Sequence, residues 1–396
     1  MNMNEQMKES EESILHTYNR FPVVFEKGQG CYLYDSEGKE YLDFAAGIAV
    51  NSLGYHYPGY DEALKDQIDK LMHISNLYYN EPIIEAGAKL VKASKMSKAF
   101  FTNSGTEAIE GALKAAKKYA YVRDGHADHE IIAMNHSFHG RSIGALSVTG
   151  TAHYREPFEP LMGGVKFADF NDLESVKAQI TDKTCAIITE VVQGEGGIYP
   201  AKKEFLEGLR QICDEKDIML IFDEIQCGMG RTGHYFAWQA YGVQPDIMTS
   251  AKALGCGVPV GAFVLGEKAA KASLEPGDHG TTYGGNPFVC AAVSKVFDIY
   301  ENDKIIEHVQ EMTPYLEQKL DEIVAKHECA ATRRGMGFMQ GIVIQGRQVG
   351  EVVKAALAKG LLVISAGSDV LRIVPPLVIT KEHIDKMAAI LDECME

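Results

Sequence analysis

The sequence lacks the features that mark membrane, secreted and repeat proteins. No apolar run approaches the roughly 20 residues that a membrane-spanning helix needs. Met1 to Ser13 are polar and acidic, without the basic-then-apolar pattern of a signal peptide. There is no internal repeat, low-complexity tract or long Pro/Ser linker. We therefore expect a soluble, cytoplasmic protein.

Paired cysteines and basic charge are also scarce. The eight cysteines are spread along the chain and none forms a CxxC pair, which favours free thiols in a reducing cytosol. With 39 Lys and Arg against 55 Asp and Glu, the formal net charge is −16, which argues against a nucleic acid or an anionic membrane as a partner.

The histidines give no recognisable metal motif. The pairs His126/His129 and His136/His139 have close spacing, but neither is accompanied by carboxylates or thiolates in a usual metal-binding pattern. We expect no metal site and interpret these residues as surface or loop histidines, with the role of His139 left open.

Short apolar runs that alternate with longer helical stretches are what the chain does contain. The 396 residues, of which 46% are hydrophobic, can bury a large core. Between about Tyr55 and Pro287 the alternation is typical of a mainly parallel sheet with helices on both faces. The predicted strands are 99–102, 131–134, 185–189, 218–222, 247–249 and 260–265. This predicts an α/β protein with a large domain at residues 55–287.

The two ends of the chain are predicted to form a smaller α+β domain together, from residues 1–54 and 288–396. Strands are expected at 31–34, 41–44, 341–344 and 370–373, with turns at 28–30 and 35–38. Helices are expected near the N-terminus and at 303–328, 349–359 and 381–394.

A small-residue loop before a helix is the first candidate binding feature. A strand ends at Thr102, and Gly105 and Thr106 open a helix that is predicted to run to about Val122. Free N–H groups and the positive end of the helix dipole suit a phosphate there. Capping by Ser104 or Thr106 alone explains the pattern equally well.

Two further candidates follow predicted strands, where ligands bind in sheets of this kind. Asp223 ends an apolar run, and a carboxylate at that place can pair with a protonated ring nitrogen, although a helix cap or a metal ligand is the alternative. Lys252 lies among Ala251, Ala253 and Leu254, where desolvation would lower its pKa and make it a nucleophile toward an aldehyde. A snorkelling lysine is the alternative. Together with the phosphate loop, these residues describe a pyridoxal-phosphate pocket.

Five motifs carry a resemblance to a known family. They are Asn103-Ser-Gly-Thr-Glu-Ala, Ser137-Phe-His-Gly-Arg, Thr189-Glu-Val-Val-Gln-Gly-Glu-Gly-Gly, Phe222-Asp-Glu-Ile-Gln-Cys-Gly-Met-Gly-Arg-Thr-Gly and His279-Gly-Thr-Thr-Tyr-Gly-Gly-Asn-Pro. From Tyr18 to about Pro376 the chain resembles the fold-type I, class III pyridoxal-phosphate aminotransferases, and most closely the acetylornithine aminotransferases of arginine biosynthesis.

The resemblance implies a role for each residue of the cofactor site. Lys252 would be the Schiff-base lysine and proton shuttle, and Asp223 the partner of the ring nitrogen. The remaining implied contacts are Gly105, Thr106 and, from the other subunit of a homodimer, Thr282 on the phosphate, Phe138 and Ile225 on the two ring faces, and Gln226 near the ring hydroxyl.

The resemblance also implies how substrates are held. Arg141 would bind the carboxylate remote from the reacting amine, with Thr281 and Tyr18 lining that region. Arg372 would receive the α-carboxylate of glutamate, and Glu195 would cover it as an acidic gate.

The implied reaction transfers the δ-amino group of N2-acetyl-L-ornithine to 2-oxoglutarate, giving N-acetylglutamate 5-semialdehyde and glutamate. Ile48 stands where ornithine aminotransferases keep a tyrosine that reads a free α-amino group, which favours an N-acylated donor. Succinylornithine, ornithine, N-succinyl-diaminopimelate and 4-aminobutyrate remain alternative donors. An aminomutase and a non-catalytic cofactor-binding protein are the alternatives from other functional classes.

Overall fold

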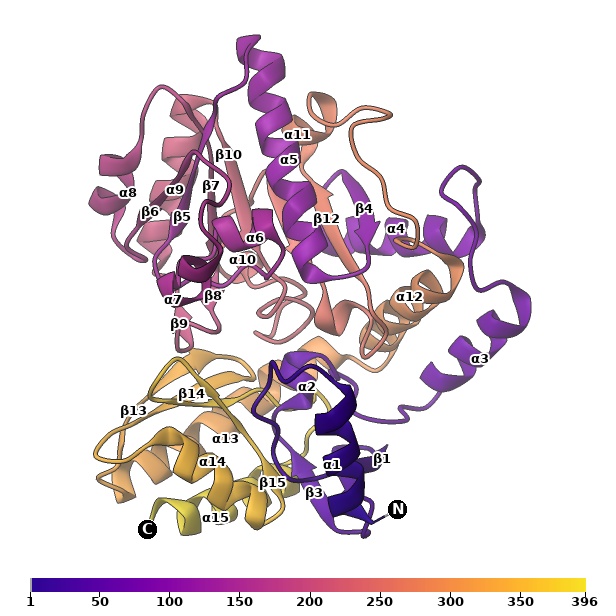
Figure 1. Cartoon of the computed structure of the whole chain (residues 1–396), viewed down its shortest axis with the longest axis vertical. Coiled ribbons are helices and arrows are strands. Elements are labelled where there is room, and N and C mark those ends of the chain that lie inside the picture. The colour runs from indigo at the N-terminus through magenta and orange to yellow at the C-terminus, as the bar shows by residue number, and fades with distance from the viewer. Residues whose placement is uncertain (1) are drawn as a thin grey trace.

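A computed structural model describes residues 2–396 of the chain. Its centre is a seven-stranded sheet in the order β4-β12-β11-β10-β7-β5-β6 (Figure 1). These strands are β4 (Lys98–Thr102), β5 (Glu130–Met134), β6 (Val165–Ala168), β7 (Thr184–Glu190), β10 (Met219–Asp223), β11 (Ile247–Ser250) and β12 (Gly261–Leu265). Only β12 runs antiparallel to its neighbours, so the predicted α/β class with a mainly parallel sheet is confirmed.

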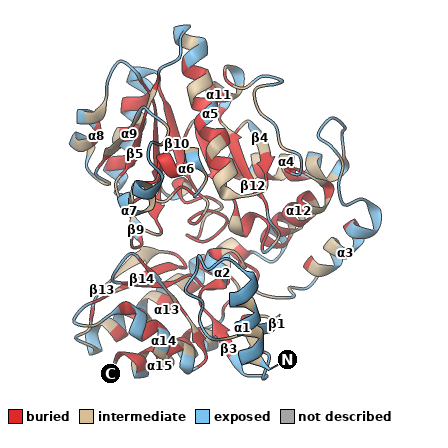
Figure 2. Ribbon diagram, in the orientation of Figure 1, coloured by how far each residue is buried: buried red, intermediate tan, exposed pale blue. Residues whose placement is uncertain are grey.

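Both faces of this sheet are covered, which explains why its strands are apolar runs rather than alternating ones. On one face, Ile188 and Ile221 pack in the same cluster as Ile109 of α5 (Gly105–Asp124). Neighbouring residues along each strand point to the opposite face. There Ile187 packs in a second cluster that includes α9 (Lys203–Lys216). Figure 2 shows the central strands as buried, with exposed positions on the outer sides of the helices.

The smaller part of the molecule, at the bottom of Figure 1, contains both chain ends, which lie on opposite sides of it in this view. One antiparallel sheet has the order β13 (Ala330–Met336), β14 (Met339–Ile344), β17 (Val370–Ile373) and β16 (Ile364–Ala366). The other has the order β1 (Phe25–Gln29), β2 (Tyr32–Asp35), β3 (Glu40–Asp43) and β15 (Leu361–Leu362). The parallel pair β3–β15 joins the N-terminal segment to the C-terminal one.

The remaining helices surround these sheets. They are α1 (Met3–Ser13), α2 (Ala46–Ala49), α3 (Tyr60–Lys70), α4 (Glu81–Ser94), α6 (Ile143–Ser147), α7 (Ala152–Arg155), α8 (Leu173–Gln179), α10 (Trp238–Tyr241), α11 (Glu267–Lys271), α12 (Pro287–Asn302), α13 (Ile305–Lys326), α14 (Val349–Ala358) and α15 (Lys381–Met395). Two short strands, β8 (Val192–Gln193) and β9 (Tyr199–Pro200), form a separate pair. Within residues 2–396, every helix is too short or too polar to span a membrane.

Most predicted elements agree with the structure, but the predicted turn at 28–30 is wrong in part. Gly28 belongs to β1, where a Cβ would lie 2.4 Å from Cγ of Tyr55, so the glycine serves close packing rather than a turn. Gly30 does turn the chain, with φ of 57°. The strands β6 and β13 were not predicted. Their sequences, Val165-Lys-Phe-Ala and Ala330-Ala-Thr-Arg-Arg, carry charges because both strands are only partly buried.

Candidate active site

Three ionisable residues stand where neighbouring parallel strands end. Glu190 is the last residue of β7, Asp223 is the last residue of β10, and Lys252 follows β11 by two residues. Because the carboxyl ends of parallel strands meet at one edge, all three line the same cavity of about 420 Å³. The cavity is also lined by the predicted site residues Gly105, Thr106, Phe138, Arg141, Ile225 and Gln226.

Lys252 lies at a strained turn between β11 and a short 3₁₀ helix, Lys252–Leu254. Its φ is 51°, a left-handed conformation that residues other than glycine rarely adopt. The carbonyl of Lys252 accepts hydrogen bonds from Gly255 N at 3.1 Å and Cys256 N at 3.2 Å, which stabilise the turn. The strained conformation directs the side chain toward the cavity that it lines.

The environment of Lys252 makes its amine a nucleophile near neutral pH. Burial, and to a smaller extent the charge of Arg372, lower the pKa of the Lys252 amine to about 8. A larger fraction of the side chain is therefore neutral than for a solvated lysine, and only the neutral amine can attack a carbonyl.

Asp223 is fixed by three hydrogen bonds. Its Oδ2 is 2.7 Å from Nδ1 of His139, while Oδ1 accepts from Ile225 N at 3.0 Å and from the Thr249 hydroxyl at 3.2 Å. The carboxylate is 3% exposed, and these contacts fix its orientation inside the cavity wall. His139, whose role the sequence left open, therefore supports Asp223.

The helix α5 begins at the cavity with the glycine and threonine that were predicted to hold a phosphate. Ser104 is its N-cap and accepts a hydrogen bond from Glu107 N, which leaves the N–H groups of Gly105 and Thr106 ahead of the first intrahelical bonds. A Cβ at Gly105 would lie 2.9 Å from Cδ1 of Ile225. Glycine therefore keeps open a gap beside the positive end of a 20-residue helix.

A buried arginine lies at the border of the cavity. Nη1 of Arg372 is 2.5 Å from Oε1 of Glu195 and 3.1 Å from Oε1 of Gln226, and Nη2 donates to the Ser365 carbonyl at 3.1 Å. Arg372 is 3% exposed, whereas the Glu195 side chain is 25% exposed. Gln226 lines the cavity of Lys252, and Arg372 lines a second hollow of about 1030 Å³ beside Ile48. The two hollows therefore meet at the Gln226–Arg372 hydrogen bond.

A second arginine is available on the outer side of the cavity. The Arg141 guanidinium lies 3.9 Å from the ring centroid of Tyr154 and 5.3 Å from that of Phe138. These cation–π contacts orient an exposed side chain without neutralising its charge. Arg141 is thus free to meet an anion at the entrance.

Three predicted site residues lie elsewhere in the single chain. Tyr18 is 71% exposed, and the Arg20 guanidinium lies 5.9 Å from its ring centroid. Thr282 is exposed, and Thr281 accepts a hydrogen bond from the Asn103 side chain at 3.2 Å. Both threonines line a separate hollow with Asn103 and Glu107 rather than the cavity of Lys252.

Sequence reasoning missed one charged residue of the cavity, Glu190. Its Oε1 accepts from Gly194 N at 3.0 Å and its Oε2 from Phe138 N at 3.2 Å, so it links two loops of the site. Burial raises the pKa of the Glu190 carboxyl to about 7. Its position at the end of an apolar run was the available signal, because Asp223 and Lys252 were found by the same rule.

The residues of the cavity fit pyridoxal phosphate. A helix start can receive the phosphate, Asp223 can pair with a pyridinium nitrogen, and the Lys252 amine can react with the aldehyde. A parallel sheet that carries these groups at its carboxyl edge defines a pyridoxal-phosphate enzyme of fold-type I.

The chain belongs to the class-III aminotransferase family, whose sequence model matches residues 14–395. It is 47% identical to the acetylornithine aminotransferase of Clostridium acetobutylicum, over 98% of this chain and 100% of that one. It is 44% identical to the succinylornithine transaminase of Yersinia pseudotuberculosis, over 94% and 92% of the two chains.

A solved structure agrees with this family. The N-acetylornithine aminotransferase of Stenotrophomonas maltophilia has a TM-score of 0.85 and 36% identity, with 98% of each chain covered. The predicted family, enzyme class and pyridoxal-phosphate cofactor are confirmed.

Proposed function

We propose that this aminotransferase moves the δ-amino group of N2-acetyl-L-ornithine to 2-oxoglutarate, yielding N-acetyl-L-glutamate 5-semialdehyde and L-glutamate. The observation that carries the proposal is the Arg372–Glu195 ion pair beside the Lys252 cavity. A first substrate with one carboxylate needs only one cation, while glutamate and 2-oxoglutarate need two. Arg141 is the cation available to both kinds of substrate. Arg372, which Glu195 can cover or uncover, is the second cation that glutamate and 2-oxoglutarate need.

The cofactor supplies an aldehyde that condenses with amines and a ring that accepts the electron pair released when a C–H bond breaks. In this proposal Gly105 and Thr106 would bind the phosphate, Phe138 and Ile225 would hold the ring, and Gln226 would contact the ring hydroxyl.

Lys252 moves the proton of the reaction. Its Nζ takes a proton from the Cδ of acetylornithine in the first half-reaction, and gives one to the Cα of the incoming 2-oxoglutarate in the second. A pKa of about 8 suits this role, because an amine with a pKa near the working pH can both accept and donate a proton. Asp223 holds the ring nitrogen protonated and is itself held by His139.

Glu195 acts as a gate for the second cation. While acetylornithine is bound, Glu195 neutralises Arg372, whose charge would otherwise be buried without a partner. When glutamate or 2-oxoglutarate binds, its α-carboxylate replaces that of Glu195. The more exposed Glu195 can leave toward solvent, whereas Arg372 stays held by Gln226 and Ser365.

The identity of the amino donor depends on the residues beside Arg372. Ile48 lines the hollow beside Arg372 and has no polar group to read a free α-amino group, which favours an N-acylated donor over ornithine. Succinylornithine is the nearest alternative, because a relative of that name is 44% identical. A dedicated aminomutase would not need a gated cation for a second dicarboxylate.

We further propose a homodimer with shared active sites and a cytoplasmic location. Leu77, Tyr78 and Tyr79 are 86%, 65% and 95% exposed, an apolar group that favours a protein interface. Thr282, exposed and outside the cavity of its own chain, would reach the partner's phosphate site. All eight cysteines are free, which suits a reducing compartment.

A panel of ω-amino donors assayed with 2-oxoglutarate tests the substrate. We expect the highest kcat/KM for N2-acetylornithine, and a higher value for N2-succinylornithine, ornithine, N-succinyl-diaminopimelate or 4-aminobutyrate would overturn this assignment. Ile48→Tyr should raise the use of ornithine relative to acetylornithine. Lys252→Ala provides the control, because it should abolish turnover of every donor.

A further inference from the structure

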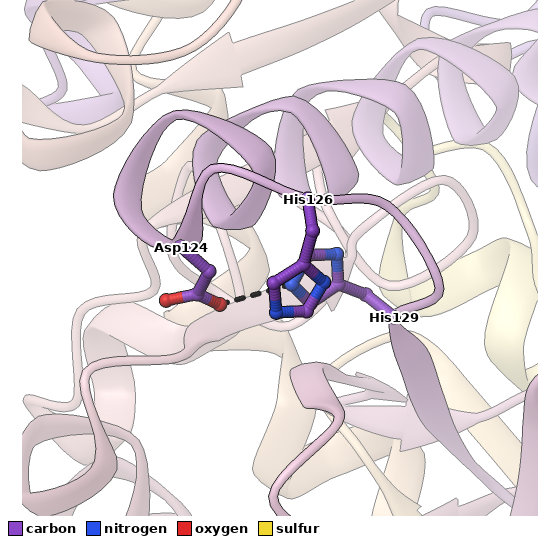
Figure 3. A group of neighbouring side chains, drawn as sticks. All are labelled: Asp124, His126 and His129. Carbon is purple, nitrogen blue, oxygen red and sulfur yellow. Dashed lines mark hydrogen bonds and ion pairs between the residues drawn. The ribbon is translucent and has the colours of Figure 1, made fainter.

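A carboxylate and two imidazoles converge at the end of α5 that lies away from the cavity. They belong to Asp124, the last residue of the helix, and to His126 and His129 in the short connection to β5 (Figure 3). One ligand atom from each residue lies within 4.8 Å of the other two. Since the 20-residue helix is roughly 30 Å long, this group is separate from the active site at Gly105.

The backbone brings these side chains together by reversing direction. Gly125 caps α5 with φ of 74°, a left-handed conformation that lets the chain fold back beside the last turn. The two imidazole rings stack with centroids 4.9 Å apart and planes 8° apart. The spacing of His126 and His129 predicted no metal site, whereas the last turn of α5 brings the Asp124 carboxylate beside them.

Two of the three groups are already held in place. Nε2 of His129 is 2.9 Å from Oδ2 of Asp124, and the His129 backbone carbonyl accepts a hydrogen bond from the Lys117 ammonium at 2.9 Å. The His129 side chain is only 2% exposed, whereas His126 is exposed and can rotate toward the other two. Asp124 and His129 are therefore fixed, and the His126 side chain is the part of the site that can move.

We propose that Asp124, His126 and His129 bind a divalent cation of the Zn²⁺ class. Two imidazole nitrogens and one carboxylate oxygen form a ligand set that zinc accepts with water in the fourth position. Ligand atoms on a tetrahedral zinc ion lie roughly 3.4 Å apart, so the exposed His126 ring must rotate out of its stack on His129 to point a nitrogen at the same ion. The negative end of the α5 dipole at the same place favours a cation.

The charges around the site keep its affinity moderate. The Arg123 guanidinium donates to both oxygens of Asp124 at 2.6 Å, which orients the carboxylate but places a positive charge near the metal. Asp128, a further carboxylate, is paired with Lys183 at 2.5 Å. Binding in the micromolar range is expected rather than the tighter binding of a closed structural zinc site.

The test is a titration of chelator-treated holoenzyme with Zn²⁺ by calorimetry. Wild type should bind one ion per chain, and His126→Ala should weaken that binding by at least about tenfold. The matched control is His16→Ala, because His16 is also exposed and lies beside one carboxylate, Glu11, but has no second imidazole. His126→Ala should keep its transaminase activity, which separates this result from any failure of the proposed function.

A second measurement identifies the ligands. Electron paramagnetic resonance of the Cu²⁺-loaded protein should show coupling to two imidazole nitrogens in wild type and to one in His126→Ala. The proposal is overturned if wild type binds no Zn²⁺ at sub-millimolar concentration, or if His126→Ala and wild type bind it equally well.

Discussion

Replacing Lys252 by methionine should make the cofactor-free protein more stable near neutral pH, although it removes the residue proposed to carry the proton. The pKa of the Lys252 amine is about 8, against an ordinary value of 10.5. One pKa unit corresponds to about 1.4 kcal/mol, so keeping this amine in the folded protein costs up to about 3 kcal/mol when it is protonated. Methionine has a similar length and no charge, so it avoids that cost.

The sign of the pH dependence follows from where the proton is bound more tightly. Between pH 8 and 10.5 the unfolded chain holds the lysine proton while the folded chain has released it. The free energy of unfolding of wild type therefore rises with pH across this window. The advantage of Lys252→Met should be greatest below pH 8, shrink through the window and disappear above pH 10.5.

Urea unfolding of both cofactor-free proteins at several pH values measures this difference. Titrations of groups distant from Lys252 cancel when the two proteins are compared at the same pH. Lys65→Met, at an exposed lysine of α3, should show no such pH-dependent gain. A gain for Lys252→Met that stays constant from about pH 7 to about pH 10 would refute the reasoning, because it would come from apolar contacts rather than from removal of a desolvated amine.

Three further predictions concern the proposed roles. Asp223→Asn should fold normally but slow proton abstraction from the donor at least about 100-fold; stopped-flow measurement of the donor half-reaction checks this, and an unchanged rate would rule out the role. Glu195→Gln should impair the half-reaction with acetylornithine and spare the half-reaction with glutamate, while Arg372→Ala should do the reverse. Single-turnover rates of the two half-reactions measure this, and equal losses in both half-reactions would contradict the proposed gate. Dilution of the holoenzyme to monomers should release the cofactor if Thr282 completes the partner's phosphate site; sedimentation with cofactor absorbance tests this, and a monomer that retains cofactor would contradict it.

The central sheet was predictable because burial on both faces requires apolar runs, and the chain has few other apolar runs of that length. The same rule failed at β6 and β13, where partial exposure allows Lys166 or Arg333 within a strand. It also failed at Gly28, where a glycine suggested a turn but packing against Tyr55 was the cause. A charged residue within a short strand thus hides it from a rule based on apolar runs.

The site shows the same division between local and distant information. Lys252 and Asp223 could be brought together from sequence because each ends an apolar run, and the carboxyl ends of parallel strands share one edge. Glu190 satisfies the same rule and stands in the same motif as Glu195, but its contacts with Phe138 N and Gly194 N depend on how two loops meet, which the sequence does not show.

The Arg372–Glu195 ion pair, unlike Lys252 and Asp223, could not be predicted from the positions of apolar runs in the sequence. The two residues are 177 positions apart, and Arg372 belongs to β17 in a different sheet from the one that carries Lys252. Their contact depends on how the smaller part of the molecule sits against the strand ends, which periodicity does not encode. Arg372 is buried next to an amine whose pKa it lowers, so each charge makes the other harder to bury without Glu195. Because Glu195 is the carboxylate paired with Arg372, this second buried cation is stable only while Glu195 stays or while a substrate brings another carboxylate. This is the physical reason to expect a gate rather than a fixed ion pair.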